Sequence, residues 1–326
     1  MVDALARLME EGRFTRCIDT ADQMLRQGGW SPAQMAAIHL ISCRCRLQLQ
    51  DVQGAVEAGQ AAVRLAQQEG QYDLLGRALL NLGTAHAALQ QYDQALRCFF
   101  DYFTHMPHYQ EARRLEGAVW KHLGVTYQRR LEPEKAAYAL EEAQRWFAVR
   151  QIDHGAFTSR HDLINVYLYM SAADRSKLVA VRRLLFRQQE IARRYPTEPY
   201  YTGTYLLDVS AWLLRSGRPV LAAVAASEAL AVWPDDPVHA FHCHLVLHHC
   251  ALARESPRLA LGHVLAACSA AVAAADPQLE RLATEILGDL VEREGVAILR
   301  ELGRSPVDSV LAGKVPLPPP LRRNLQ

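Results

Sequence analysis

The sequence lacks a clear excess of either charge. It has 36 lysines and arginines against 35 aspartates and glutamates, which gives a formal net charge of +1. A protein that is drawn to nucleic acid or to an anionic membrane by its overall field carries a marked basic excess, because that field attracts the phosphates. We therefore expect no direct nucleic-acid binding and no membrane partner.

Long hydrophobic runs are also missing. The most apolar stretches, 220–233 and 264–275, are shorter than the ~18 residues that a membrane-spanning helix needs, or are interrupted by Glu228. Residues 1–12 contain acidic side chains and no apolar segment of the kind found in signal peptides. We expect a cytoplasmic location.

Cysteines are few and do not have the spacing of a disulfide framework. There are seven, an odd number, and all lie in sequence with a helical pattern. Such cysteines usually serve as small apolar residues in a reducing compartment. We expect reduced, buried thiols at Cys17, Cys43, Cys45, Cys98, Cys243, Cys250 and Cys268.

The common catalytic motifs are absent. The sequence contains no glycine-rich phosphate loop, no G-x-S-x-G, no H-E-x-x-H and no paired C-x-x-C. We predict a protein that is not an enzyme, with no catalytic residues and no cofactor.

Metal-binding residue types are concentrated in residues 239–250. At 100° per residue, one broad helical face holds His239, His242, Cys243, His249 and Cys250, and the opposite side holds His244 and His248. One helix presents only two ligands within reach of one ion, whereas a tetrahedral site needs two more. The nearest further candidates are His263 and Cys268 on the next helix. We favour helix packing and predict no metal site.

The sequence does contain a regular series of amphipathic helices, and hydrophobic residues make up 50% of it. Turn and capping residues divide the chain into helix pairs, with Asp51 as a predicted N-cap and Pro133 in a first turn. The predicted pairs are 2–11 with 14–26, 32–48 with 52–67, 72–89 with 92–104, 110–129 with 133–149, 154–170 with 174–195, 200–215 with 219–232, 238–254 with 257–275, and 277–294 with 296–302. This pattern predicts one elongated all-α domain over 1–312, followed by a proline-rich, disordered tail over 313–326.

Two sequence motifs lie in residues 76–127. The pattern W-x₂-L-G-x₂-Y is formed by Trp120, Leu123, Gly124 and Tyr127, and the pattern A-x₃-F…P is formed by Ala95, Phe99 and Pro107. Through these motifs the chain resembles the tetratricopeptide repeat family, with its best-formed repeats over 72–150. The resemblance implies a right-handed α–α superhelix of about seven to eight helix hairpins.

The spacing between repeats is unusually long. Residues 83 and 124 are both glycines at the signature position, and residues 95 and 136 are both alanines, so each pair is 41 residues apart. The ordinary tetratricopeptide period is ~34 residues. We therefore expect each helix of these repeats to be about one turn longer than usual.

The family resemblance implies a binding surface. In tetratricopeptide proteins the first helix of each pair faces a concave groove that binds a protein or peptide segment. Transferred to the matching positions of this sequence, the groove residues are Arg77, Leu80, Thr84, Lys121, Val125, Gln128 and Arg129. We predict a non-catalytic scaffold for a protein or peptide partner, and the sequence does not indicate an oligomeric state.

Where the motif fades, helical periodicity extends the prediction. Asp162, Asn165, Val166 and Tyr169 share one helical face, and Leu207, His242 and His249 are assigned to the same groove. An asparagine there can donate to and accept from a peptide main chain. Asn165 could equally replace the signature glycine and face the next helix. The two histidines titrate near neutral pH, which predicts pH-sensitive binding.

A narrower resemblance offers an alternative function. Repeats of about 40 residues with a degenerate C-terminal half are similar to the peptide-sensing tetratricopeptide regulators of Gram-positive bacteria. This implies a ligand- or peptide-sensing regulator of transcription or of a signalling partner. Most such regulators carry an N-terminal effector domain, whereas this sequence starts in a shortened repeat, so we favour the binding scaffold.

Overall fold

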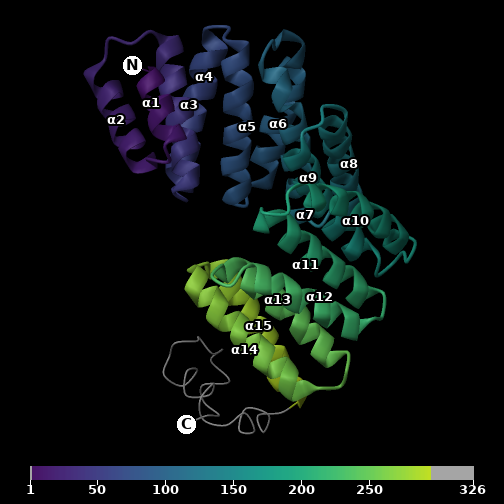
Figure 1. The fold of residues 1–326 in the computed structure, drawn as a ribbon. Coiled ribbons are helices and arrows are strands. Elements are labelled where there is room, and N and C mark those ends of the chain that lie inside the picture. Colours follow the sequence, from purple (N-terminus) through teal and green to yellow (C-terminus); the bar gives the residue numbers. More distant parts are fainter. Residues whose placement is uncertain (1, 295–326) are drawn as a thin grey trace, which may run out of the picture. The chain divides into compact units, whose positions relative to one another are not determined.

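The computed structural model describes residues 2–294 and contains α-helices and short 3-10 helices, with no strand in that range (Figure 1). The predicted last helix, 296–302, and the predicted tail, 313–326, lie outside it. The elements are α1 (Val2–Glu10), α2 (Phe14–Gln27), α3 (Pro32–Gln48), α4 (Val52–Gln68), α5 (Tyr72–Ala88), α6 (Tyr92–His105), η1 (Met106–His108), η2 (Ala112–Leu115), α7 (Glu116–Arg129), α8 (Pro133–Val149), α9 (Asp153–Met170), α10 (Lys177–Arg194), α11 (Pro199–Arg215), α12 (Pro219–Val232), α13 (Pro237–Leu252), α14 (Pro257–Ala274) and α15 (Pro277–Glu294). The prediction of an all-α chain of consecutive helix hairpins is confirmed.

The chain divides into two compact units, residues 1–166 and residues 167–326. The division falls inside the continuous helix α9. We call them the N-terminal and the C-terminal unit and describe each by itself. The single domain over 1–312 stays a prediction.

The same turn joins helix after helix. After α3, for example, Gln50 adopts a left-handed φ of 59° and the N–H of Asp51 donates to the carbonyl of Arg46 at 2.9 Å. This hydrogen bond, from the sixth residue back to the first, is that of the Schellman motif, which satisfies a free carbonyl at a helix end. The left-handed residues of the equivalent turns are Gly12, Gly70, Gln90, Leu131, Gln151, Gly217 and Glu255. As predicted, the Asp51 side chain then caps α4 by accepting from the N–H of Gly54.

The predicted helix over 110–129 is wrong in its first part, since α7 begins only at Glu116. A carboxylate oxygen of Asp73 in α5 accepts from the backbone N–H groups of Gln110 and Ala112 at 2.9 and 2.8 Å. The Tyr102 hydroxyl in α6 donates to the carbonyl of Ala112 at 2.7 Å. These bonds stabilise η2 in place of a regular helical turn. The expectation that every helix of these repeats is longer is therefore wrong for α6 and α7, which have 14 residues each. The long period between Gly83 and Gly124 comes from residues 106–115 between these two helices. Helices of 17 residues do occur at α3, α4, α5 and α8.

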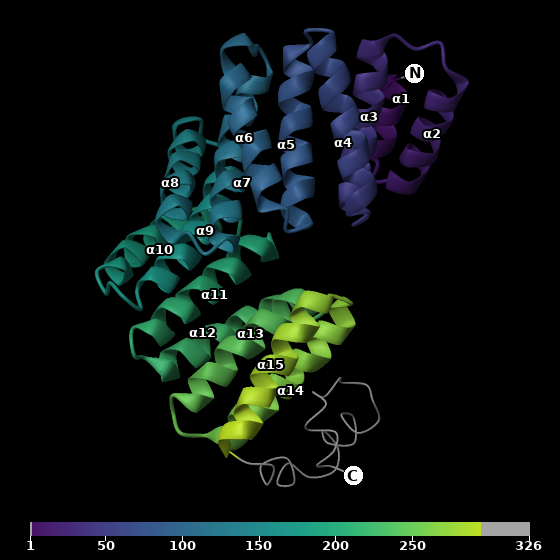
Figure 2. The same cartoon turned by 180° about the vertical axis from the view of Figure 1, so that it is seen from behind.

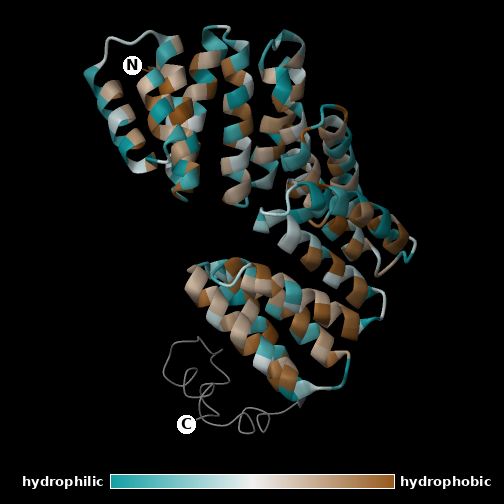
Figure 3. Cartoon of the chain, in the orientation of Figure 1, coloured by the Kyte–Doolittle hydropathy of each residue, from teal (hydrophilic) through white to brown (hydrophobic). Residues whose placement is uncertain are grey.

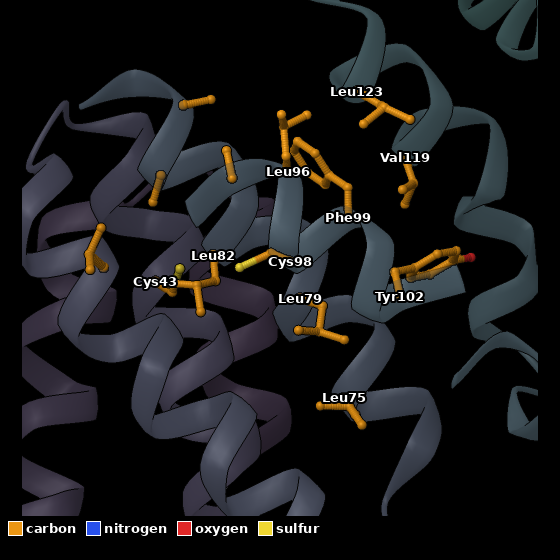
Figure 4. Packing of buried hydrophobic residues seen from close by; sticks show 14 of the residues in the cluster. Cys43, Leu75, Leu79, Leu82, Leu96, Cys98, Phe99, Tyr102, Val119 and Leu123 are labelled. Atoms are coloured by element: carbon orange, nitrogen blue, oxygen red, sulfur yellow. The ribbon is translucent and has the colours of Figure 1, made fainter. Parts of the chain in front are cut away.

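The core of the N-terminal unit lies between neighbouring hairpins, and Figure 4 shows part of it. Phe99 and Tyr102 of α6 are fully buried against leucines of α5 and α7. Phe99 can pack closely because Gly83 of α5 has no side chain, and a Cβ atom there would lie 2.5 Å from Cε1 of Phe99. The signature glycine and phenylalanine therefore form a close helix crossing, as the motif predicts.

The C-terminal unit has a core built from α13, α14 and α15, and α12 and α14 are apolar along much of their length (Figure 3). The sequence-based view that no stretch reaches the length of a membrane span is wrong for α14, whose 18 residues are long and apolar enough by length and composition. In the structure Leu261, Val264 and Ala271 of α14 are fully buried with Phe241 of α13 and Leu287 of α15. This packing is that of a helix in the core of a helical repeat.

Candidate functional site

A cavity of about 470 Å³ opens on the N-terminal unit at the first helices of its hairpins. Helices α1, α3 and α5 line it, together with the end of η2, and α5 stands beside α3 and α4 in Figures 1 and 2. We call it the N-terminal cavity. Its lining residues are Ala6, Met9, Leu40, Ile41, Arg44, Arg77, Leu80, Asn81, Arg114 and Leu115. Aliphatic side chains thus form most of its surface, and its charged members are all arginines.

The three arginines of the cavity differ in whether a carboxylate lies near them. Arg77 donates to Glu111 at 2.7 Å, and Arg114 lies 3.7 Å from the same carboxylate. Arg44 is exposed and has no carboxylate within ion-pair distance among residues 2–294. The cavity therefore carries more positive than negative charge, and Arg44 can bind an incoming carboxylate without losing an existing partner.

The period of the hairpins explains how these side chains come together. Helices α3 and α5 begin at residues 32 and 72 and have the same length, so residues 40 apart hold the same helical position. Leu40 therefore corresponds to Leu80, and Arg44 corresponds to Thr84. Side chains at equivalent positions of stacked repeats face the same side.

Three of the predicted groove residues lie on α5. Arg77 and Leu80 line the N-terminal cavity. Thr84 is half-buried, and its hydroxyl donates to the carbonyl of Leu80 at 2.9 Å, which is an ordinary internal bond of a helix. The structure therefore brings Arg77 and Leu80 to a cavity. Arg44 and Arg114 complete that cavity but were not predicted.

The predicted residues of α7 are already engaged within the fold. The Lys121 ammonium lies 3.7 Å from the carboxylate of Asp162 in α9, and both side chains are largely buried. Arg129 donates to the carbonyl of Ala87 at 3.3 Å and so stabilises the end of α5. Val125 and Gln128 are half-buried. Both predicted cations thus have an acceptor within the fold, and their role toward a ligand stays a prediction.

The predicted face of α9 is not uniform. Val166 is only 1% exposed, so its assignment to the groove surface is wrong; the periodicity could not distinguish a buried face from an accessible one. Asn165 is half-buried, with its amide nitrogen 3.2 Å from Nε2 of His161 one turn earlier. Its role toward a peptide stays a prediction.

The remaining predicted residues belong to the C-terminal unit. Tyr169 is 58% exposed, His242 and His249 are exposed, and Leu207 is half-buried. The pKa of His249 is lowered mainly by partial desolvation, and the positive charges of His248 and Arg215 nearby lower it further. Any proton-sensitive role of His249 therefore shifts to lower pH than that of an ordinary histidine.

The histidines and cysteines of α13 have separate environments. His239 stacks on Trp233 with ring centroids 3.8 Å apart and bonds to Asp236 at 2.7 Å. His248 is buried and its Nδ1 donates to the carbonyl of Ala260 at 2.9 Å. Within residues 2–294, no three His, Cys, Asp or Glu side chains converge on a possible metal position.

No protein-family model matches the sequence, and no curated protein is significantly similar to it. Solved structures do share the fold. The apo form of the quorum sensor NprR from B. thuringiensis matches with a TM-score of 0.64 and 9% identity, over 96% of this chain and 87% of that one. BtubC (BKLC) from P. vanneervenii matches with a TM-score of 0.53 and 15% identity, over 71% of this chain and 91% of that one. The chain has the fold of a tetratricopeptide-like helical repeat protein.

Proposed function

We propose that this protein is a non-catalytic scaffold, and that its N-terminal cavity binds an acidic segment of a partner protein. The observation that carries the proposal is the combination of an aliphatic lining with Arg44, an exposed guanidinium that has no carboxylate partner in the described chain. A guanidinium offers a planar pair of donors that matches a carboxylate. Leu40 and Leu80 offer apolar surface to a neighbouring side chain of the same segment.

The first helices of three successive hairpin elements contribute to this surface, which suits an extended ligand. Met9 of α1, Leu40 of α3 and Leu80 of α5 lie along it. Asn81 provides an amide that both donates and accepts, so it can pair with a peptide main chain. The expected ligand is a short peptide segment with a carboxylate next to an aliphatic or aromatic residue.

The proposal is tested by selecting binders from a displayed library of random peptides and titrating each one, labelled with a fluorophore, by fluorescence anisotropy. Arg44→Glu should weaken binding of the selected acidic peptides by about 1–3 kcal/mol, because it removes a charge-assisted bond and adds repulsion. Arg97→Glu is the matched control, since Arg97 is exposed on α6 and does not line the cavity. Equal loss in both variants, or in neither, would contradict the proposal.

The alternative function, a peptide-sensing regulator, requires a conformational change in addition to binding. A ligand can act as a signal only if it binds two conformations of the protein with different affinity. Small-angle scattering with and without a selected peptide distinguishes the two functions: the scaffold predicts an unchanged profile, and the sensor predicts a changed one. We also propose a cytoplasmic location, which the seven buried free cysteines support.

A further inference from the structure

Helix α10 of the C-terminal unit exposes large hydrophobic side chains beside unpaired cations. Val179 is 57% exposed and Phe186 is 65% exposed, and the two lie two turns apart on one face. Arg182, Arg183 and Arg187 are exposed around them, and none has a carboxylate partner among residues 2–294. A solvated helix face is usually polar, so large exposed hydrophobic side chains among cations indicate a binding surface.

This face forms one wall of a cavity of about 650 Å³, the largest of the cavities described here. Helix α11 lies beside α10 (Figure 2). It forms the opposite wall of the cavity and contributes Tyr205, Val209 and Trp212. We call this cavity the C-terminal cavity. Its apolar lining and its size fit a bulky side chain, and its arginines are placed to bind acidic groups next to that side chain.

Hydrogen bonds between α10 and α11 fix the walls of this cavity. Gln188 donates to Asp208 at 2.7 Å, and the Trp212 indole donates to the carbonyl of Leu178 at 3.1 Å. Gln188 is fully buried and Asp208 is 2% exposed. A cavity with walls held in this way is already formed before a ligand arrives, which reduces the ordering cost of binding.

Charge decides which kind of ligand fits. Helix α10 carries six basic residues and one acidic residue, Glu190. The chain's own residues 313–326 contain Lys314, Arg322 and Arg323 and no acidic residue, so they have the wrong charge to occupy the site. The apolar lining favours a side chain over a sugar–phosphate backbone, which would pair with cations and leave the lining uncovered.

We propose that the C-terminal cavity is a second binding site, for an acidic segment of a partner protein that inserts an aromatic or large aliphatic side chain. Phe186 and Trp212 hold the inserted side chain, and Arg183 and Arg187 bind the carboxylates on either side of it. The site uses helices α10 and α11 and is independent of the N-terminal cavity. The protein would thus bind two acidic segments, one on each unit.

The test starts from the same random peptide display on the full chain, followed by titration of each selected peptide. Peptides that bind here should be rich in Asp and Glu around an aromatic or large aliphatic residue. Their dissociation constants should rise about tenfold or more in the double variant Arg183→Glu/Arg187→Glu, because like charges then face each other. Phe186→Ser should produce a comparable rise. All three replaced side chains are exposed, so circular dichroism and melting temperature should match the wild type.

Controls separate this site from the N-terminal one. Arg254→Glu reverses the charge of one exposed arginine of the same unit that does not line the cavity, and Arg44→Glu disables the other cavity. Both should leave these peptides bound as in the wild type, and raising the salt concentration should weaken binding in all but the α10 double variant.

Three outcomes would overturn the proposal. In the first, every selected peptide loses affinity only through Arg44→Glu, which supports the N-terminal site alone. In the second, a labelled single-stranded oligonucleotide binds more tightly than every selected peptide and loses affinity through the α10 variants, which identifies a nucleic-acid surface. In the third, the selection yields no peptide whose binding is sensitive to the α10 variants.

Discussion

A Cβ atom on Gly124 of α7 would lie 2.6 Å from Cγ of Leu140 in α8. Gly83 of α5 and Phe99 of α6 have the same relationship one repeat earlier, at 2.5 Å. In both hairpins the first helix can approach the second only because the signature residue has no side chain. The glycine of the motif therefore determines the distance between the two helices of each hairpin.

Gly124→Leu should destabilise the N-terminal unit by ~1–3 kcal/mol, because the new side chain overlaps Leu140 and the carbonyl of Ala136. Thermal melts followed by circular dichroism measure the effect. Gly262→Leu is the control, since a Cβ atom at that helical glycine of α14 meets nothing within 4 Å. A melting temperature that is unchanged by Gly124→Leu would mean that the crossing is not tightly packed.

The repeated turn allows opposite substitutions to be compared at two equivalent positions. Gly70 and Gln90 occupy equivalent left-handed positions, with φ of 63° and 60°. A residue with a Cβ atom loses about 1 kcal/mol in this conformation relative to glycine. Gln90→Gly should therefore raise the melting temperature and Gly70→Gln should lower it. Shifts of the same sign in the two variants would show that backbone strain does not control these turns.

Acidic pH should destabilise the C-terminal unit. Burial, as the largest cause, lowers the pKa of His244, His248, His249 and His263. The folded state thus binds fewer protons than the unfolded state near pH 6, so the stabilisation is complete above the ordinary histidine pKa of ~6.5 and is lost as the pH falls below it.

Melting curves between pH 8 and pH 5 test this expectation. The wild type should melt at progressively lower temperature as the pH falls, and His248→Gln should show a smaller decrease because one buried titrating group is gone. A parallel pH dependence in both proteins would exclude His248 as a contributor.

The thiols should be unreactive in the native protein. All seven cysteines are buried, and burial raises the pKa of Cys43, Cys98 and Cys268 to about 12. Since the thiolate is the reactive form, an aromatic disulfide reagent should modify them slowly in buffer and completely in denaturant. Rapid modification of one thiol in buffer would indicate local unfolding around it.

Much of the fold could be predicted because local signals agree with the tertiary structure. The helices at 32–48, 133–149 and 219–232 begin and end where capping residues and prolines predict. The start of α7 could not be predicted, because the acceptor that stabilises η2 is Asp73, which is distant in sequence and acts only after α5 has packed against that segment.

The site was only partly predictable for a related reason. Transferring the motif positions found Arg77 and Leu80, and extending the same register by one hairpin would have found Leu40 and Arg44. Arg114 lies in the irregular segment, where no periodicity applies. The motif also does not encode internal ion pairs, such as the one between Lys121 and Asp162.

The central claim is that the N-terminal cavity recognises a peptide carboxylate through Arg44. The most direct measurement is a double-mutant cycle by titration calorimetry, which combines Arg44→Glu with a selected peptide whose acidic residue is replaced by lysine. The account predicts a coupling free energy of about 1 kcal/mol or more, since the reversed pair restores an attraction that each single change removes. Effects of the two changes that add to within about 0.3 kcal/mol would contradict it.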